Sequence, residues 1–97
     1  MSASVSVLGA TAYDPQRPWR LHPQVALRPE SFGALAYHYG NRRLVFLRSP
    51  VLVELVESLA DYDSADAAID AVVEPSRRAE FSTALARLAV SEVIDAR

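Results

Sequence analysis

Cysteine and lysine are absent from this chain of 97 residues, and it contains no long hydrophobic run. Without cysteine the chain has no disulfides, thiolate metal ligands, iron–sulfur ligation or thiol catalysis of its own. No stretch approaches the roughly 20 apolar residues that cross a bilayer, so we expect no membrane association. A cytoplasmic location fits this composition. The apolar fraction of 51% indicates a globular chain, and its length has room for one domain.

All ten basic residues are arginine, and they are unevenly distributed along the chain. Residues 17–48 contain six of them against the single acid Glu30, whereas residues 49–74 contain seven acids and no base. We expect the positive part to meet an acidic partner, with mutual neutralisation of the two parts as the alternative. The net charge of −2 lacks the basic footprint of a nucleic-acid-binding domain, so nucleic acid is not an expected partner.

The first part of the chain has the weakest structural pattern. The dipeptides Asp14-Pro15 and Arg17-Pro18 interrupt any regular secondary structure. They predict a flexible N-terminal arm over residues 1–18, with Trp19 as its anchor. The folded, peptide-binding domain is predicted over residues 19–97. Within it, residues 24–28 predict a short strand whose flanking prolines favour a position at the edge of a sheet.

A β-hairpin is predicted between Leu35 and Leu47, because Gly40-Asn41 favours a two-residue turn. The register that follows pairs Tyr39 with Arg42, Tyr37 with Leu44, and Leu35 with Phe46. Paired residues project to the same face, so the bulky side chains Leu35, Tyr37, Leu44 and Phe46 share one face. We expect this bulky face to be the core face. The opposite face, apolar at Val45 and Leu47, is expected to contact something else.

Three helices are predicted after the hairpin. Ser49 and Pro50 suit the N-cap and the first position of a helix, and Asp63 or Ser64 can cap a second. The third runs roughly from Pro75 to Ile94. Its apolar arc is wider than one core contact requires, which makes the helix either central in the domain or one wall of a groove.

No catalytic or metal-binding pattern is present in the sequence. His22 and His38 are the only histidines, and neither has a second ligand at metal-binding spacing, so no metal site is expected. The acids of residues 61–70 lack the oxygen donors and the glycine of a calcium loop. No tyrosine has an adjacent base, and no glycine-rich phosphate loop occurs. The chain is therefore not expected to be an enzyme.

Three strands followed by three helices outline an α+β, winged-helix-like fold with a three-stranded antiparallel sheet. Three features carry a family resemblance: Arg-Leu-His-Pro-x-Val-x-Leu-Arg-x-Glu-x-Phe-Gly-Ala from Arg20, the Gly40-Asn41 hairpin, and Leu47-Arg48-Ser49-Pro50. With them the chain resembles the peptide chaperones of mycofactocin biosynthesis. These are relatives of the pyrroloquinoline-quinone chaperone and of the recognition elements of ribosomally made, modified peptides, known as RiPP recognition elements. The resemblance extends from about Trp19 to the C-terminus.

This resemblance implies a non-enzymatic chaperone with no cofactor of its own. In the family, the leader region of a short precursor peptide adds itself to the sheet as a strand, in the cleft between the third strand and the third helix. Here these elements correspond to Arg42 to Arg48 and Pro75 to Ile94. The chaperone then presents the peptide to a radical S-adenosylmethionine (radical SAM) maturase, and the iron–sulfur clusters belong to that partner.

The residues themselves lead to a compatible prediction. An edge strand presents unpaired backbone N–H and C=O groups, with which an extended peptide can pair. The predicted peptide-binding residues line the strand and the third helix, and the arginines among them would face acidic leader residues. They are Arg43, Val45, Leu47, Arg48, Arg78, Leu85, Ala86, Ala89 and Val93. Each apolar member has core packing as its alternative role.

A DNA-binding transcriptional regulator of the winged-helix class is the alternative function. It would place the third helix in the major groove and the arginines of the hairpin tip on phosphates. The outward positions of that helix disfavour this alternative, because Ala79, Ala86 and Val90 cannot read bases and the helix has no Asn, Gln or Lys. The oligomeric state stays open.

Overall fold

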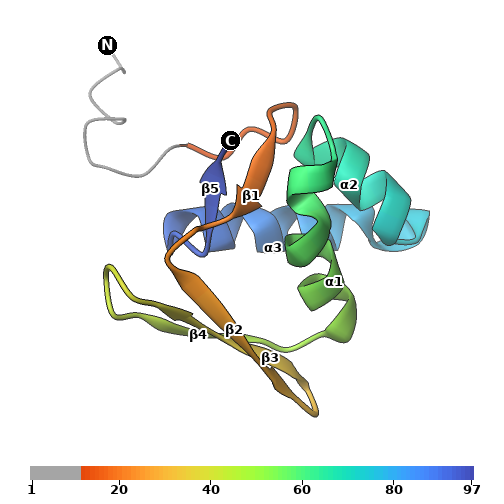
Figure 1. The fold of residues 1–97 in the computed structure, drawn as a ribbon. Helices are drawn as coiled ribbons and strands as arrows, with labels where there is room; N and C mark the ends of the chain where they lie inside the picture. Colours follow the sequence, from red (N-terminus) through yellow and green to blue (C-terminus); the bar gives the residue numbers. More distant parts are fainter. Residues whose placement is uncertain (1–11) are drawn as a thin grey trace.

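The computed structural model describes residues 12–97, and the first eleven residues of the predicted arm lie outside the described part. The strands are β1 (Trp19–Leu21), β2 (Val25–Glu30), β3 (Gly33–His38), β4 (Leu44–Leu47) and β5 (Ile94–Ala96). The helices are α1 (Pro50–Ser58), α2 (Ala65–Val72) and α3 (Arg78–Val90), with 3-10 turns η2 (Leu59–Asp61) and η3 (Pro75–Arg77). Figure 1 shows the three helices on one side of the sheet formed by β2, β3 and β4.

The predicted α+β class is confirmed. Strands β2, β3 and β4 form an antiparallel sheet in that order, and three helices follow, an arrangement compatible with the winged-helix-like description. A second, two-stranded sheet was not expected from the sequence. It pairs β1 with β5, so that Trp19 lies opposite Ala96 and Leu21 opposite Ile94. No helix of residues 12–97 is long and apolar enough to span a membrane.

The predicted helix starts are confirmed at both serines. The Ser49 hydroxyl accepts the N–H of Leu52 at 3.2 Å, and the Ser64 hydroxyl accepts the N–H of Ala67 at 3.0 Å. The predicted extent of the third helix is wrong at its end. Helix α3 stops at Val90, and Ile94 already belongs to β5.

Residues 12–18 run along the start of α2. The carbonyls of Pro15 and Arg17 accept the N–H groups of Asp66 and Ala65 at 2.9 and 3.0 Å. Trp19 is almost completely buried, as an anchor should be, and its indole N–H donates to the Asp14 carbonyl at 2.8 Å. The domain boundary at residue 18 stays a prediction.

The hairpin has the predicted register, with Leu35 opposite Phe46 and Tyr37 opposite Leu44, but not the predicted turn. The last pair is His38 with Arg43, joined by a 3.0 Å bond from the His38 N–H to the Arg43 carbonyl. Tyr39 does not pair with Arg42, because its N–H donates to the Gln24 carbonyl at 2.8 Å. The loop therefore spans residues 39–42, and Arg42 closes it with a left-handed φ of 64°.

The prediction that the bulky face of the hairpin is the core face is wrong. Ala34 and Ala36 of β3 and Leu47 of β4 are buried, whereas Leu44 and Phe46 are 55% and 47% exposed. The physical reason is that α1 contacts β3 directly, and small side chains on β3 allow the helix to approach. Because side chains alternate along a strand, small residues inside force the large ones outside.

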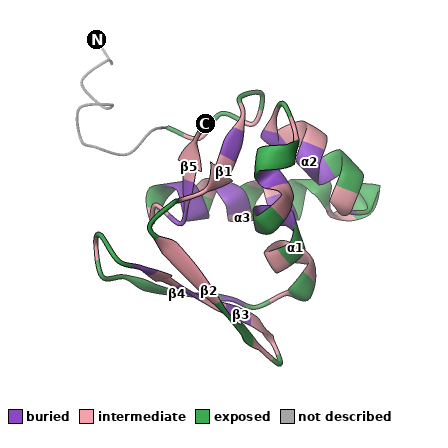
Figure 2. Ribbon diagram, in the orientation of Figure 1, coloured by how far each residue is buried: buried purple, intermediate pink, exposed green. Residues whose placement is uncertain are grey.

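One core joins the sheet, the three helices and the β1–β5 pair. Its largest fully buried side chains are Trp19, Leu47, Leu55, Val56, Leu59, Ile69, Leu85, Val93 and Ile94. In Figure 2 the buried residues of the helices and of β1 face one another, while in the sheet β3 alternates between buried and half-buried positions and β2 has no buried residue. Core residues on α3 therefore contact the same cluster as Leu47 of β4.

Gly33 lies directly against the backbone of Leu47 and Ser49. Its φ is 148°, and a Cβ atom built there would lie 2.1 Å from the Leu47 carbonyl oxygen. Only glycine fits, because the obstacle is backbone and cannot rotate away.

We expect Gly33→Ala to lower the free energy of unfolding by about 2 to 3 kcal/mol, as strained backbone and a clash with the Leu47 carbonyl add together. Urea denaturation followed by circular dichroism measures this. Gly40→Ala is the matched control, since the nearest atom to its added Cβ is the flexible end of Gln24, at 2.6 Å. An equal loss in both variants would contradict the explanation.

Candidate functional site: the open edge of the sheet

Strand β4 is the last strand of its sheet, and no strand of residues 12–97 pairs with its outer side. The bond between His38 and Arg43 fixes which backbone groups are used. Hydrogen-bonded pairs alternate in an antiparallel ladder, so Val45 and Leu47 bond to β3, while the N–H and C=O groups of Leu44 and Phe46 point away. The close approach of the Leu47 carbonyl to Gly33 agrees with this direction.

The opposite edge of the sheet, β2, is largely closed. The bond from the Tyr39 N–H to the Gln24 carbonyl makes Val25, Leu27 and Pro29 the outward-directed residues of β2. The Val25 N–H already donates to the His22 carbonyl at 2.9 Å, and Pro29 has no N–H. Only Leu27 keeps an unused donor on this edge. Proline and local bonds of this kind disfavour strand addition, so β4 is the more open edge of the sheet.

The structure places the nine predicted peptide-binding residues in three environments. Fully in the core lie Leu47, Leu85, Ala89 and Val93, while Val45 is half-buried against the same cluster and Ala86 is half-buried on α3. Exposed to solvent are Arg43, Arg48 and Arg78. Val45 and Leu47 of β4 thus belong to the same core cluster as the buried residues of α3, and the groove with two walls stays a prediction. The outward backbone of Leu44 and Phe46 was missed, because it follows from the observed hydrogen bonds and not from residue types.

The arginines differ in their partners. Arg78 forms an ion pair with Asp70 of α2 at 2.7 Å, and the Arg48 guanidinium lies 4.8 Å from the centre of the Phe46 ring. Arg43 has no acidic partner among residues 12–97. At the start of α3, Arg77 binds Glu80 through two hydrogen bonds, which lower the pKa of that carboxyl. Of the three arginines predicted to bind the peptide, Arg43 and Arg48 are therefore the two whose guanidinium groups form no ion pair within residues 12–97.

Mutual neutralisation of the two oppositely charged parts of the chain does not occur through ion pairs in the described residues. The ion pairs found there join Arg20 to Asp95, Arg28 to Glu30, Arg77 to Glu80 and Arg78 to Asp70. None links an arginine of residues 17–48 with an acid of residues 49–74. The sheet side stays positive, and the surface of α1 and α2 stays acidic.

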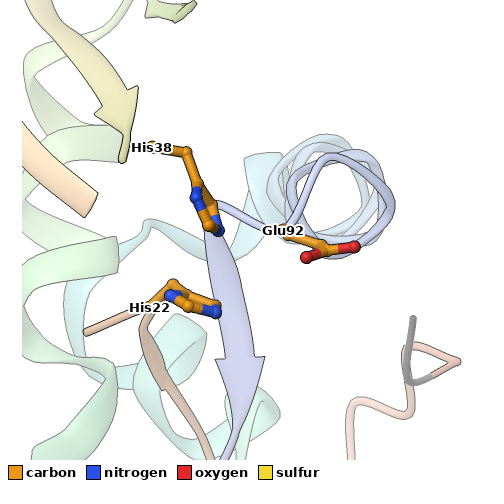
Figure 3. A group of neighbouring side chains, drawn as sticks. All are labelled: His22, His38 and Glu92. Atoms are coloured by element: carbon orange, nitrogen blue, oxygen red, sulfur yellow. The ribbon is translucent and has the colours of Figure 1, made fainter. Parts of the chain in front are cut away.

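Three titratable side chains that the sequence did not connect meet near the hairpin tip. His22 follows β1, His38 ends β3 and Glu92 follows α3, and Figure 3 shows them side by side. Their potential ligand atoms all lie within 4.8 Å of one another. His38 is only 3% exposed, and its Nε2 atom has no hydrogen-bond partner among residues 12–97. Residues from three distant segments carry no common spacing, so sequence alone could not have found them.

The hydrogen bonds of the two rings favour a carboxylate contact over a metal ion. His38 Nδ1 accepts the N–H groups of Gly40 and Asn41 at 3.0 and 3.2 Å, and His22 Nδ1 accepts that of Gln24 at 3.0 Å. In a neutral ring an accepting Nδ1 leaves the proton on Nε2. A metal ligand binding through Nε2 instead donates its other N–H. The two Nε2–H groups are therefore better suited to an electrostatic contact with the nearby Glu92 carboxylate than to a metal ion, although no hydrogen bond joins them to it in the described residues.

Glu92 occupies a position that usually belongs to glycine. Its φ is 65°, and it follows the end of α3, where the Val93 N–H donates to the Leu88 carbonyl at 2.9 Å and the Glu92 N–H donates to that of Ala89 at 3.1 Å. This is the Schellman ending, whose left-handed residue is most often glycine. Glutamate at this position carries a conformational cost of about 1 kcal/mol.

We expect Glu92→Gly to destabilise the protein by about 1 kcal/mol, although glycine relieves the backbone, because the two imidazole rings lose the negative charge that lies within 4.8 Å of their nitrogen atoms. Urea denaturation measures the change. Glu92→Gln keeps the side-chain length and should fall between the parent and the glycine variant. A glycine variant that is more stable than the parent would mean that the carboxylate does not hold the rings.

A winged-helix-like α+β domain with an open sheet edge is an arrangement that peptide-binding modules use. The family model for the Peptide chaperone MftB family matches residues 18–95. The chain belongs to this family, as its sequence resemblance indicates, and a peptide chaperone is not an enzyme.

Curated relatives named Peptide chaperone MftB agree with this assignment. The protein of Mycobacterium ulcerans is 48% identical over 87 residues, covering 89% of this chain and 80% of the relative. That of Mycobacterium tuberculosis is 45% identical over 86 residues, covering 88% and 79%, and that of Mycolicibacterium smegmatis is 45% identical over 92 residues, covering 94% and 90%. No solved structure matches the chain.

Proposed function

We propose that this chain binds the leader region of a ribosomally made precursor peptide, that of mycofactocin, as an additional strand on β4 and presents it to a radical SAM maturase. The observation that carries the proposal is the asymmetry of the sheet: β4 is open, whereas β2 is largely closed by Pro29 and by the bond between Val25 and His22. Membership of a peptide chaperone family supports it.

The peptide would pair with the backbone groups of Leu44 and Phe46. Its side chains would alternate between the two faces of the sheet. Those on the inner face would extend the row of Val45 and Leu47 toward α3, where Ala86 is half-buried and Ala89 is a small core residue. Arg43 and Arg48, which have no acidic partner among residues 12–97, would bind acidic leader residues.

The core residues of the proposed site would shape it without contacting the peptide themselves. Leu85 and Val93, like Leu47 and Ala89, belong to the core cluster that includes both α3 and β4, and would border the space that the inward peptide side chains enter. Arg78 is engaged with Asp70 and would meet an acidic peptide residue only in exchange for that ion pair. The maturase would supply all redox chemistry and its clusters.

We expect Leu44→Pro to weaken leader-peptide binding at least about tenfold, because it removes one edge donor worth about 1.5 kcal/mol in a pre-formed site. The fold should persist, since the Leu44 N–H does not bond to β3 and proline is tolerated on edge strands. Isothermal titration with the precursor peptide encoded beside this chain measures the affinity.

Two comparisons make this test specific. Leu44→Thr removes the same apolar side chain but keeps the N–H, and should bind the peptide like the parent. Val45→Pro should unfold the hairpin, because the Val45 N–H bonds to Ala36 on β3. If the folded Leu44→Pro variant binds the peptide unchanged, strand addition at β4 is wrong.

A further inference from the structure

We infer that the outer face of the β2–β3–β4 sheet is a docking surface for a partner protein that presents an apolar patch bordered by carboxylates. The outer face consists of Leu35, Tyr37, Leu44 and Phe46, with Phe32 and Tyr39 at its two ends. The inference rests on the proposed function, in which the partner is the maturase that receives the peptide.

The apolar side chains of the outer face form one continuous layer. Leu35 lies opposite Phe46 and Tyr37 opposite Leu44, so the four share one face of two paired strands. Phe32 stacks on Phe46 with a distance of 5.8 Å between the ring centres. The rings of Tyr37 and Tyr39 meet edge to face, with their centres 5.3 Å apart. Tyr39, Leu44 and Phe46 are 61%, 55% and 47% exposed.

This layer lies outside the hydrophobic core of residues 12–97. The core lies on the other face of the sheet, and neither the core nor the half-buried residues packed against it include Leu35, Tyr37, Leu44 or Phe46. Contiguous exposed apolar surface of this kind is uncommon on a monomer unless it binds another molecule. Aromatic side chains with polar surroundings are also the composition of interface centres.

The charges around the layer select the kind of partner. Two arginines lie at this layer. Arg28 projects from β2 opposite Leu35 and is paired with Glu30 at 2.9 Å, whereas Arg48 has no acidic partner among residues 12–97. The Arg48 guanidinium lies over both Phe46 and Phe32, at 4.8 and 5.9 Å from the ring centres. A second copy seated face to face would oppose arginines with arginines, which is repulsive. The partner is therefore a different protein with carboxylates around its apolar centre.

The position of the outer face fits presentation of a peptide. It shares Leu44 and Phe46 with the open edge, whose backbone would pair with the peptide. Every second side chain of an added strand would extend the outer layer. A protein seated on this layer would therefore contact the bound peptide directly, so that docking and delivery occur on one surface.

The test uses the double variant Leu35→Thr and Tyr37→Thr on β3, which keeps strand-forming side chains and leaves the β4 edge unchanged. Biolayer interferometry of the full chain with the maturase encoded beside it should show affinity at least about tenfold weaker than the parent. The affinity of the parent should also fall as salt rises. The leader-peptide affinity of the variant should stay within about twofold of the parent, and thermal unfolding checks the fold.

Val90→Thr is the matched control, since Val90 is an apolar side chain that is 72% exposed on α3, away from the sheet face. It should change neither affinity. Maturase binding that survives the double variant, or a parent that does not bind the maturase, would overturn the inference. A parent dimer in sedimentation that the double variant abolishes would also overturn it and assign the face to a second copy. A parent that binds the maturase but not the peptide would instead defeat the proposed function.

Discussion

The packing of α1 against β3 is the constraint on which the rest of the structure depends. Ala34 and Ala36 are the inward residues of β3, and both are almost completely buried. Such small side chains let the core residues of α1, Leu55 and Val56, approach the sheet. The alternation of side chains along a strand then places Leu35 and Tyr37 outside. The apolar outer face is thus a direct consequence of a close helix–sheet contact.

The same hairpin links the outer face to the open edge. In an antiparallel ladder, a residue whose backbone does not bond to its neighbour strand directs its N–H and C=O to the free side. In β4 these residues are Leu44 and Phe46, and their side chains are also the exposed ones. Each therefore contributes its backbone to the edge and its side chain to the face. The two proposed binding surfaces therefore meet along a strand of four residues.

Local patterns predicted the elements, whereas tertiary contacts determined what the patterns could not. The helix starts at Ser49 and Ser64 could be predicted from N-capping, and the pairing of Leu35 with Phe46 from cross-strand side-chain pairs. Both are interactions between residues close in sequence. Side-chain size could not predict which face of the hairpin points to the core, because burial on β3 depends on how closely α1 approaches. The β1–β5 pair was missed because three-residue strands show no period, and the end of α3 because Glu92 takes the place of the usual glycine.

The separation of charge gives the two proposed binding surfaces, the open edge and the outer face, the same preference for acidic ligands. In the described residues no ion pair joins the arginines of residues 17–48 to the acids of residues 49–74, so the sheet side keeps a positive potential. An acidic peptide or protein is attracted to the open edge and the outer face, and repelled by the acidic surface of α1 and α2. Because such steering acts before contact, it favours the orientation in which peptide and partner arrive at β4 together.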